Sequence, residues 1–255
     1  MQAKKYLYLP LSLSLLAGGA QAQISLESLS TAAPKEGFSG NAALSMRMDR
    51  GNVEREDYSL GTRLQWHQAP STSFVVLEGS YGKADGEKNA DRTFIHARHI
   101  RQFSDRSAGE VYAQQETNTF ARIDYLRMLG GGARFTLYKQ EDRGNAYFGI
   151  GLYRSYQKTT DVGDGSEKET MNRANSYLNM NWQLSPSTVL GSHTQYQPSL
   201  DDSKDYRFQQ QLHAKVRINT RFALMVSADY RYDNQPPEGV HKSDVTYKTS
   251  LTYDF

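Results

Sequence analysis

The sequence predicts an all-β protein, a single antiparallel up-and-down transmembrane β-barrel of about twelve strands with both termini on the periplasmic side. Three observations predict this fold. Apolar and polar residues alternate with a period of two from residue 37 onward, as in Leu212, His213, Ala214, Lys215 and Val216. Short and long polar connections alternate along the chain, which is typical of membrane barrels. After the N-terminus, no run of 18 apolar residues is present that could form a membrane-spanning helix.

The N-terminal residues have the pattern of a secretory signal peptide. Lys4 and Lys5 precede an apolar run over residues 6–16, and Ala20 and Ala22 supply the small residues of a cleavage site. A buried helix is the alternative interpretation, but Pro10 lies inside the run and Gly18-Gly19 follow it. The run is also shorter than the roughly 20 residues of a membrane span. We therefore expect residues 1–22 to be a cleaved signal, 23–36 a periplasmic segment, and 37–255 the barrel.

The first testable prediction is that the mature chain begins at Gln23. The signal peptidase recognises small residues at the positions that Ala20 and Ala22 occupy, so cleavage follows Ala22. Intact-mass analysis of protein from outer-membrane fractions measures this directly. Recovery of the full-length chain from the inner membrane would contradict both the cleavage and the barrel.

Nine stretches show the alternation clearly, namely 38–48, 58–66, 75–81, 147–153, 177–182, 190–196, 207–218, 222–232 and 244–255. Three weaker stretches lie between them, at 92–103, 109–116 and 119–139, which brings the expected number of strands to twelve. The last of these contains the triplet Gly130-Gly131-Gly132. Glycines inside a strand usually mark a bend or close packing against a bulky neighbour, and we expect the same here rather than a ligand site.

The connections between these strands fall into two groups. Longer polar links are expected near 49–56, 83–91, 158–169, 197–205 and 233–242, and shorter ones near 69–71, 104–108, 141–145, 185–187 and 219–221. The short link near Asn118 is an exception. With an even number of strands and periplasmic termini, every long link lies on the extracellular side. An open antiparallel sandwich is the soluble alternative, but it would not sort its loops by side and would leave edges to protect.

Composition excludes several classes of function. The chain has no cysteine, so disulfide frameworks, thiol catalysis and a lipoprotein anchor are excluded. The net charge of +2 and the lack of a basic run give no sign of a nucleic-acid partner. The acidic loop residues lack the regular ligand spacing of a calcium site. We expect no cofactor and no metal.

The lumen-facing rows carry more basic than acidic residues. The acids expected to face inward are Glu78, Asp124, Asp229, Asp244 and Asp254, and Arg47 and Lys248 are inward cations. The cations predicted as the candidate site that lines the lumen are Arg63, Arg122, Arg134, Arg173, Arg207, Lys215, Arg217 and Arg231. Barrels of eight strands are filled by side chains, whereas barrels of sixteen or more leave a channel. A barrel of twelve strands lies between these cases, so both a sealed barrel and a narrow, weakly anion-preferring pore are compatible with it. We favour the sealed or barely conducting form.

An enzyme is the hypothesis from a second class. Catalysis needs a nucleophile with a base in hydrogen-bond reach and a third group that orients the base. His241 and Ser243 are two residues apart and would share a face, which would suit a lipid-modifying hydrolase. The nearest acid, Asp244, points to the other face, so no orienting group is in view. We expect no enzyme, and keep the hydrolase as the alternative.

The C-terminus resembles the assembly signal of outer-membrane barrels, because Phe255 ends the chain and Tyr253 lies two positions before it. The segments that begin at Gly37-Phe38-Ser39-Gly40, at Gly130 and at Asn234 resemble a bacterial family named for salt-induced outer-membrane proteins, a domain family of unknown function. The resemblance covers most of the chain after residue 36. It implies a monomeric barrel in the outer membrane of a Gram-negative bacterium, surrounded by lipid and lipopolysaccharide and inserted by the barrel assembly machinery. Its implied role is structural, or a response to osmotic or other stress.

Overall fold

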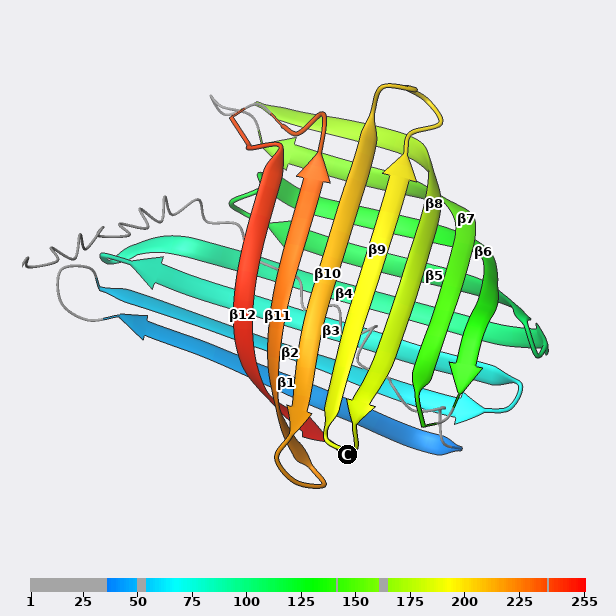
Figure 1. Ribbon diagram of the computed structural model, residues 1–255. Helices are drawn as coiled ribbons and strands as arrows, with labels where there is room; N and C mark the ends of the chain where they lie inside the picture. The colour runs from blue at the N-terminus through cyan, green and yellow to red at the C-terminus, as the bar shows by residue number, and fades with distance from the viewer. Residues whose placement is uncertain (1–35, 50–53, 141, 161–164, 238) are drawn as a thin grey trace, which may run out of the picture.

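The computed structural model describes residues 36–49, 54–140, 142–160, 165–237 and 239–255, which form a closed barrel of twelve antiparallel strands (Figure 1). This confirms the predicted antiparallel barrel of about twelve strands. The predicted cleavage residues Ala20 and Ala22 lie outside the described residues. The described part of the chain contains no helix long and apolar enough to cross a membrane. The strands are β1 (Gly37–Asp49), β2 (Arg55–Gln68), β3 (Ser71–Ala84), β4 (Glu87–Ser104), β5 (Ser107–Asn118), β6 (Ile123–Gln140), β7 (Gly144–Thr160), β8 (Ser166–Ser185), β9 (Thr188–Pro198), β10 (Tyr206–Arg217), β11 (Phe222–Asp233) and β12 (Ser243–Asp254).

The two ends of the barrel differ in their connections. Each strand pairs with its neighbours in the chain, and β1 pairs with β12, so the start of β1 and the end of β12 lie at the same end. We call this the turn end, because the five connections there, beginning with β2–β3, have between two and four residues. The opposite end is called the loop end. It carries the longest connections, which join β9 to β10 over residues 199–205 and β11 to β12 over residues 234–242.

The expected long link over 83–91 is wrong. Strands β3 and β4 continue to Ala84 and Glu87, which pair with each other, and only Asp85 and Gly86 turn the chain. Both turn residues have positive φ, 50° and 83°, as a tight hairpin turn between twisted strands requires. The link expected over 158–169 is also shorter, because β7 extends to Thr160 and β8 begins at Ser166. The loop end therefore includes tight hairpins beside its long loops.

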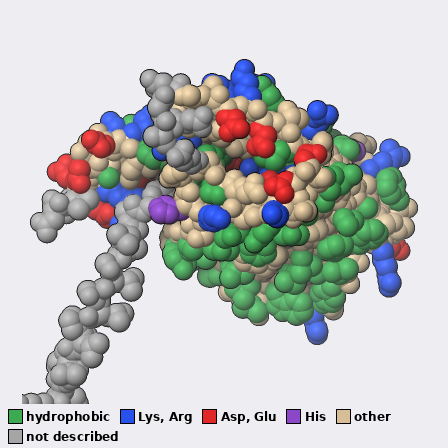
Figure 2. All heavy atoms as spheres, turned by 90° about the horizontal axis from the view of Figure 1, so that it is seen from above, with side chains coloured by type: hydrophobic (Ala, Val, Ile, Leu, Met, Phe, Trp, Pro, Cys, Tyr) green, Lys and Arg blue, Asp and Glu red, His purple; other side chains and the backbone are tan. Residues whose placement is uncertain are grey.

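The strands separate their side chains into an outer and an inner face, as the alternation predicts. On β10, Leu212 and Val216 are 52% and 45% exposed, whereas Gln211 and His213 are 5% and 8% exposed. The space-filling view shows the apolar side chains gathered over the outer wall, with charged groups around the end seen from above (Figure 2). An apolar outer belt of this kind suits a hydrocarbon environment.

The inner face is less polar than the sequence indicated. Ala43, Phe74, Val76, Phe94 and Met225 form a buried apolar cluster inside the barrel. Their side chains come from β1, β3, β4 and β11, so the cluster reaches between walls that lie apart along the ring of strands. The lumen is therefore packed with side chains at this level.

The barrel closes through a short seam. Strand β1 pairs with β2 along its whole length, but with β12 only from Asn41 to Leu44, opposite Leu251–Asp254. Two further backbone hydrogen bonds join Gly40 and Phe255, with N–O distances of 2.8 and 2.9 Å. Beyond the paired residues the two strands diverge (Figure 1). The predicted assembly residues Tyr253 and Phe255 thus lie in the seam itself.

Candidate functional site in the barrel lumen

Seven of the eight predicted lumen cations lie on the inward-facing rows of their strands. Their strands are β2, β6, β8, β10 and β11. Several have an acidic partner: Nε of Arg207 is 2.8 Å from Asp233, and Nζ of Lys215 is 2.8 Å from Asp254. Arg173, which is 1% exposed, forms an ion pair with Asp205. The positive excess expected from the sequence is therefore largely neutralised where these residues lie. The seven are Arg63, Arg134, Arg173, Arg207, Lys215, Arg217 and Arg231.

The start of β6 departs from the expected pattern. Arg122 does not belong to a strand: it lies in the β5–β6 turn with φ of 54°, and its guanidinium lies beside Gly239 of the β11–β12 connection. The strand register shifts between Ile123 and Tyr125, and this places Asp124 on the outer face, where its carboxylate lies 2.7 Å from Nζ of Lys158. The expected inward position of Asp124 is therefore wrong, because a bulge reverses which residues face inward.

Four buried charged residues inside the barrel were missing from the sequence-based set. Arg92 and Arg98 lie on β4, and Glu110 and Glu116 lie on β5, all at most 6% exposed. A signal was available, because arginine, aromatic or histidine side chains occupy every second position from 92 to 98. The two arginines and two glutamates balance in charge, so they add no net charge to the lumen.

Arg92 lies at the centre of the first ion-pair cluster. Its guanidinium contacts two carboxylates, with Nη1 3.1 Å from Glu78 and Nε 2.8 Å from Glu116. Glu116 also lies 3.8 Å from Nη1 of Arg231. Arg231 is on β11 and Glu116 on β5, six strands apart in a ring of twelve. This contact therefore joins opposite walls across the lumen.

Arg98 lies at the centre of the second cluster, closer to the turn end. Its Nη1 lies 3.4 Å from Glu110, and the hydroxyl of Tyr177 donates to the same carboxylate at 2.8 Å. The guanidinium also lies 5.1 and 5.6 Å from the ring centres of Tyr112 and Tyr177, within the range of cation–π attraction. Asn175 donates to the hydroxyl of Tyr112 at 3.3 Å. Strands β4, β5 and β8 thus meet through polar and aromatic contacts inside the barrel.

Glycines make room for these two tyrosines. A Cβ added at Gly149 would lie 2.1 Å from the ring of Tyr177, and one at Gly130 would lie 2.7 Å from the ring of Tyr112. Gly132 and Gly151 are paired across β6 and β7, where an added Cβ would meet backbone atoms at 2.3 Å. The prediction of close packing at the glycine triplet is confirmed.

The Arg98 cluster lies where two cavities meet. The loop-end cavity, of about 220 Å³, is lined along β4 by Phe94, His96 and Arg98. The turn-end cavity, of about 230 Å³, is lined along the same strand by Ile100 and Gln102. The second cluster therefore separates a cavity on the loop side from one on the turn side.

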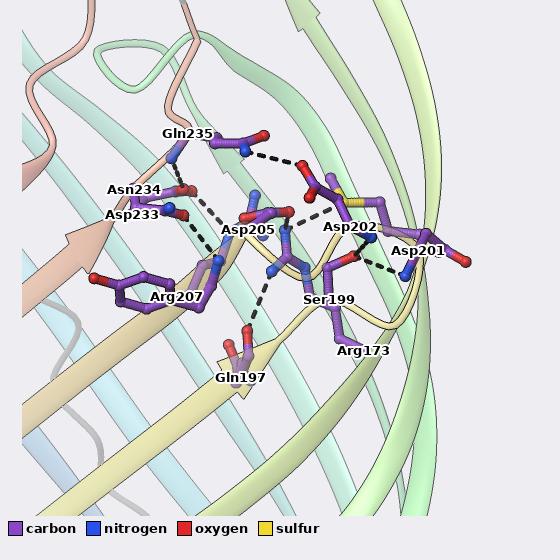
Figure 3. A network of polar contacts seen from close by, with 12 residues as sticks. Arg173, Gln197, Ser199, Asp201, Asp202, Asp205, Arg207, Asp233, Asn234 and Gln235 are labelled. Carbon is purple, nitrogen blue, oxygen red and sulfur yellow. Dashed lines mark hydrogen bonds and ion pairs between the residues drawn. The ribbon is translucent and has the colours of Figure 1, made fainter.

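A polar network fixes the rim of the loop-end cavity (Figure 3). Arg173 on β8 binds the backbone carbonyl of Gln197 at 3.1 Å and the carboxylate of Asp205. Asp202 of the β9–β10 connection accepts hydrogen bonds from the backbone N–H of Lys204 and from the side-chain amide of Gln235, which belongs to the β11–β12 connection. These two hydrogen bonds hold the pKa of the Asp202 carboxyl below its usual range. The network ties the two longest loops to the wall, so the rim is preorganised.

The hydrolase pair is not assembled. His241 lies in the β11–β12 connection and lines the loop-end cavity together with Lys242 and Asp244. Ser243 begins the outward row of β12 and does not line that cavity. Among the described residues no hydrogen bond joins these two side chains, so the geometry offers no nucleophile and base in contact.

The sequence matches one protein family. The family described as "Protein of unknown function, DUF481" matches residues 42–255, most of the chain. No curated protein matches it significantly. The family description mentions no stress, so induction by salt stays a prediction.

Solved structures share the barrel fold. An outer membrane channel from Pseudomonas putida F1 is 11% identical, with a TM-score of 0.54, and the match covers 88% of this chain and 97% of that one. The translocator domain of the autotransporter NalP from Neisseria meningitidis is 14% identical, with a TM-score of 0.52, and the match covers 87% and 89%. At these identities the likeness shows the fold, that of outer-membrane barrels.

Proposed function

This chain belongs to the DUF481 family of proteins of unknown function, and from that membership and the barrel fold we infer that it resides in the bacterial outer membrane as a barrel with an obstructed lumen. The inference places the turn end, with both termini, in the periplasm and the long loops outside the cell. Outer-membrane barrels have short periplasmic turns and longer extracellular loops, which supports this orientation.

The observation that carries the proposal is the contact between Arg231 and Glu116 across the lumen. A pore of useful width has no side chains that meet from opposite walls. Here the Arg92 cluster bridges β11 and β5, and the Arg98 cluster bridges β4, β5 and β8. Separating a buried ion pair leaves each charge without a partner in a confined interior, which is energetically costly. The paired side chains are therefore expected to stay in contact.

The role that fits an obstructed barrel is structural, or a response to osmotic or other envelope stress. Any residual water path would be narrow. It would prefer anions weakly, because the turn-end cavity is lined by Arg63, Arg134 and Lys139 and fixed charge lining a path sets the barrier for each ion sign. Among the residues that the structure describes, no contact in the lumen favours the hydrolase alternative.

Conductance of the refolded protein in planar bilayers tests the proposal. We expect a closed baseline, or small steps, because ion pairs and tyrosines fill the section between the two cavities. Insertion is verified independently by heat-modifiable migration, since closed barrels resist unfolding in detergent. Large steady currents from verified wild-type barrels would contradict the obstructed lumen.

A further inference from the structure

The turn-end cavity differs from the rest of the lumen in its charge. Arg63 on β2, Arg134 on β6 and Lys139 near the end of β6 all line it. Among the described residues, no Asp or Glu side chain lines the same cavity. The loop-end cavity carries charges of both signs in contrast, because Glu116, Asp233 and Asp244 line it beside its arginines and Lys242.

Aromatic rings lie under the two guanidiniums. The guanidinium of Arg63 lies 3.7 Å from the ring centre of Phe74, and that of Arg134 lies 3.9 Å from the ring centre of Tyr147. Arg134 makes no ion pair among the described residues. Nη2 of Arg63 also donates to Gln65 at 2.8 Å. Stacking holds the plane of the Arg134 guanidinium, whose N–H groups at the edge can bind a ligand.

Neutral polar groups complete the lining. Gln65, Gln102, Thr72 and Thr136 line the cavity with hydrogen-bonding side chains. Asn179 also lines it; the residue is 5% exposed, and its Oδ1 is buried with no hydrogen-bond partner. A half-turn of the amide keeps its shape and presents two N–H donors instead of that oxygen. A buried polar group without a partner in the protein is one that a bound polar ligand can satisfy.

An acidic residue, Glu36, lies at the edge of the cavity. Glu36 accepts a hydrogen bond from the backbone N–H of Ala69 at 3.0 Å, and its carboxylate lies 3.9 Å from Nε2 of His67. Glu36 is exposed, and His67 also bonds Thr72 at 2.8 Å. Glu36 therefore interacts with the β2–β3 turn and does not neutralise the cations inside.

We propose that the turn-end cavity is a binding site for a small oxyanion, a phosphate, sulfate or carboxylate group. Two guanidiniums and an ammonium supply the charge, and guanidinium forks match the oxygens of such groups. A cavity of about 230 Å³ holds several times the volume of one water molecule, so a free ion or the anionic end of a larger solute fits. The site does not depend on conduction, because a sealed barrel binds the anion from the turn side alone.

Thermal unfolding of the detergent-solubilised barrel tests the site. Sodium phosphate, sulfate and acetate are titrated at constant ionic strength, with chloride as the balancing salt. We expect a saturable rise in Tm with at least one of the three anions, because a ligand that binds only the folded state stabilises it. Which anion acts at the lowest concentration identifies the preferred group. No saturable effect from any of them would overturn the proposal.

Arg134→Gln is the diagnostic variant and Arg217→Gln its matched control. Both remove one arginine near the turn end, but Arg217 does not line the cavity and instead donates to the carbonyl of Pro186 at 3.4 Å. We expect Arg134→Gln to weaken the apparent affinity by roughly tenfold or more, as loss of a charge-assisted hydrogen bond does, and Arg217→Gln to leave it unchanged. Equal affinities in both variants, with heat-modifiable migration intact, would refute the assignment.

Discussion

Deletion of Phe255 is expected to remove most of the assembled barrel while leaving export intact. The seam between β1 and β12 pairs over only four residues of each strand, so the two hydrogen bonds of Phe255 with Gly40 are a large share of it. The ring of Phe255 covers Gly40, where an added Cβ would lie 2.7 Å from it, and packs against Phe38 and Tyr253. Loss of the residue therefore removes backbone pairing and packing together.

Heat-modifiable migration of outer-membrane fractions on unboiled gels gives the measurement. Phe255→Ala retains the backbone bonds, so we expect it to assemble better than the deletion and worse than the wild type. Phe135→Ala, an outward aromatic on β6 away from the seam, serves as the control and is expected to assemble normally. Normal migration of the deletion variant would show that neither the seam nor the terminal signal needs Phe255.

The inner and outer faces of the strands could be predicted from sequence, because successive side chains of a strand point to opposite faces and the apolar residues recur at every second position. Leu212 and Val216 face outward and His213 inward, as the pattern indicates. The bulge at the start of β6 could not be predicted in this way. A register shift of one residue leaves the composition of the segment unchanged, yet it moves Asp124 from the expected inner row to the outer face.

The short β3–β4 connection could have been predicted. Asp85-Gly86 is the dipeptide that a two-residue hairpin turn favours, and it lies between strand-like segments. The polar residues on either side made the segment resemble a loop. In the structure they continue the two strands instead: Lys83 pairs with Lys88, and Ala84 with Glu87.

The contacts that obstruct the lumen lie beyond sequence reasoning of this kind. Arg231 and Glu116 are 115 positions apart and lie on opposite walls. That they lie at the same level along the barrel axis can be predicted only when the strand tilt and register are known. Counting inward charges gave a basic lumen. The structure shows that basic and acidic residues pair on the loop side, whereas no Asp or Glu in the described part of the chain lines the turn-end cavity.

Opening the lumen is expected to follow from removal of the Arg98 cluster. Replacing only one partner would leave a buried charge uncompensated, at a cost of about 3–5 kcal/mol, so the variant is Arg98→Ser combined with Glu110→Ser. The two changes preserve net charge and remove the contacts that separate the two cavities. We expect a larger conductance in planar bilayers than the wild type gives, limited by the contact between Arg231 and Glu116 that still crosses the lumen.

The ion preference of the Arg98 and Glu110 variant tests whether the cations of the turn-end cavity control which ions pass. The path would run past Arg63, Arg134 and Lys139, so the reversal potential in a salt gradient should indicate anion preference. The preference should fade at 1 M salt, where the screening length falls to about 3 Å from about 10 Å at 0.1 M.

The control variant, Arg207→Ser combined with Asp233→Ser, removes a different ion pair, 2.8 Å long and at the rim, and is expected to stay closed. An Arg98 and Glu110 variant that stays closed although correctly assembled would place the obstruction at the Arg92 cluster, because Glu116 and Arg231 would still meet across the lumen.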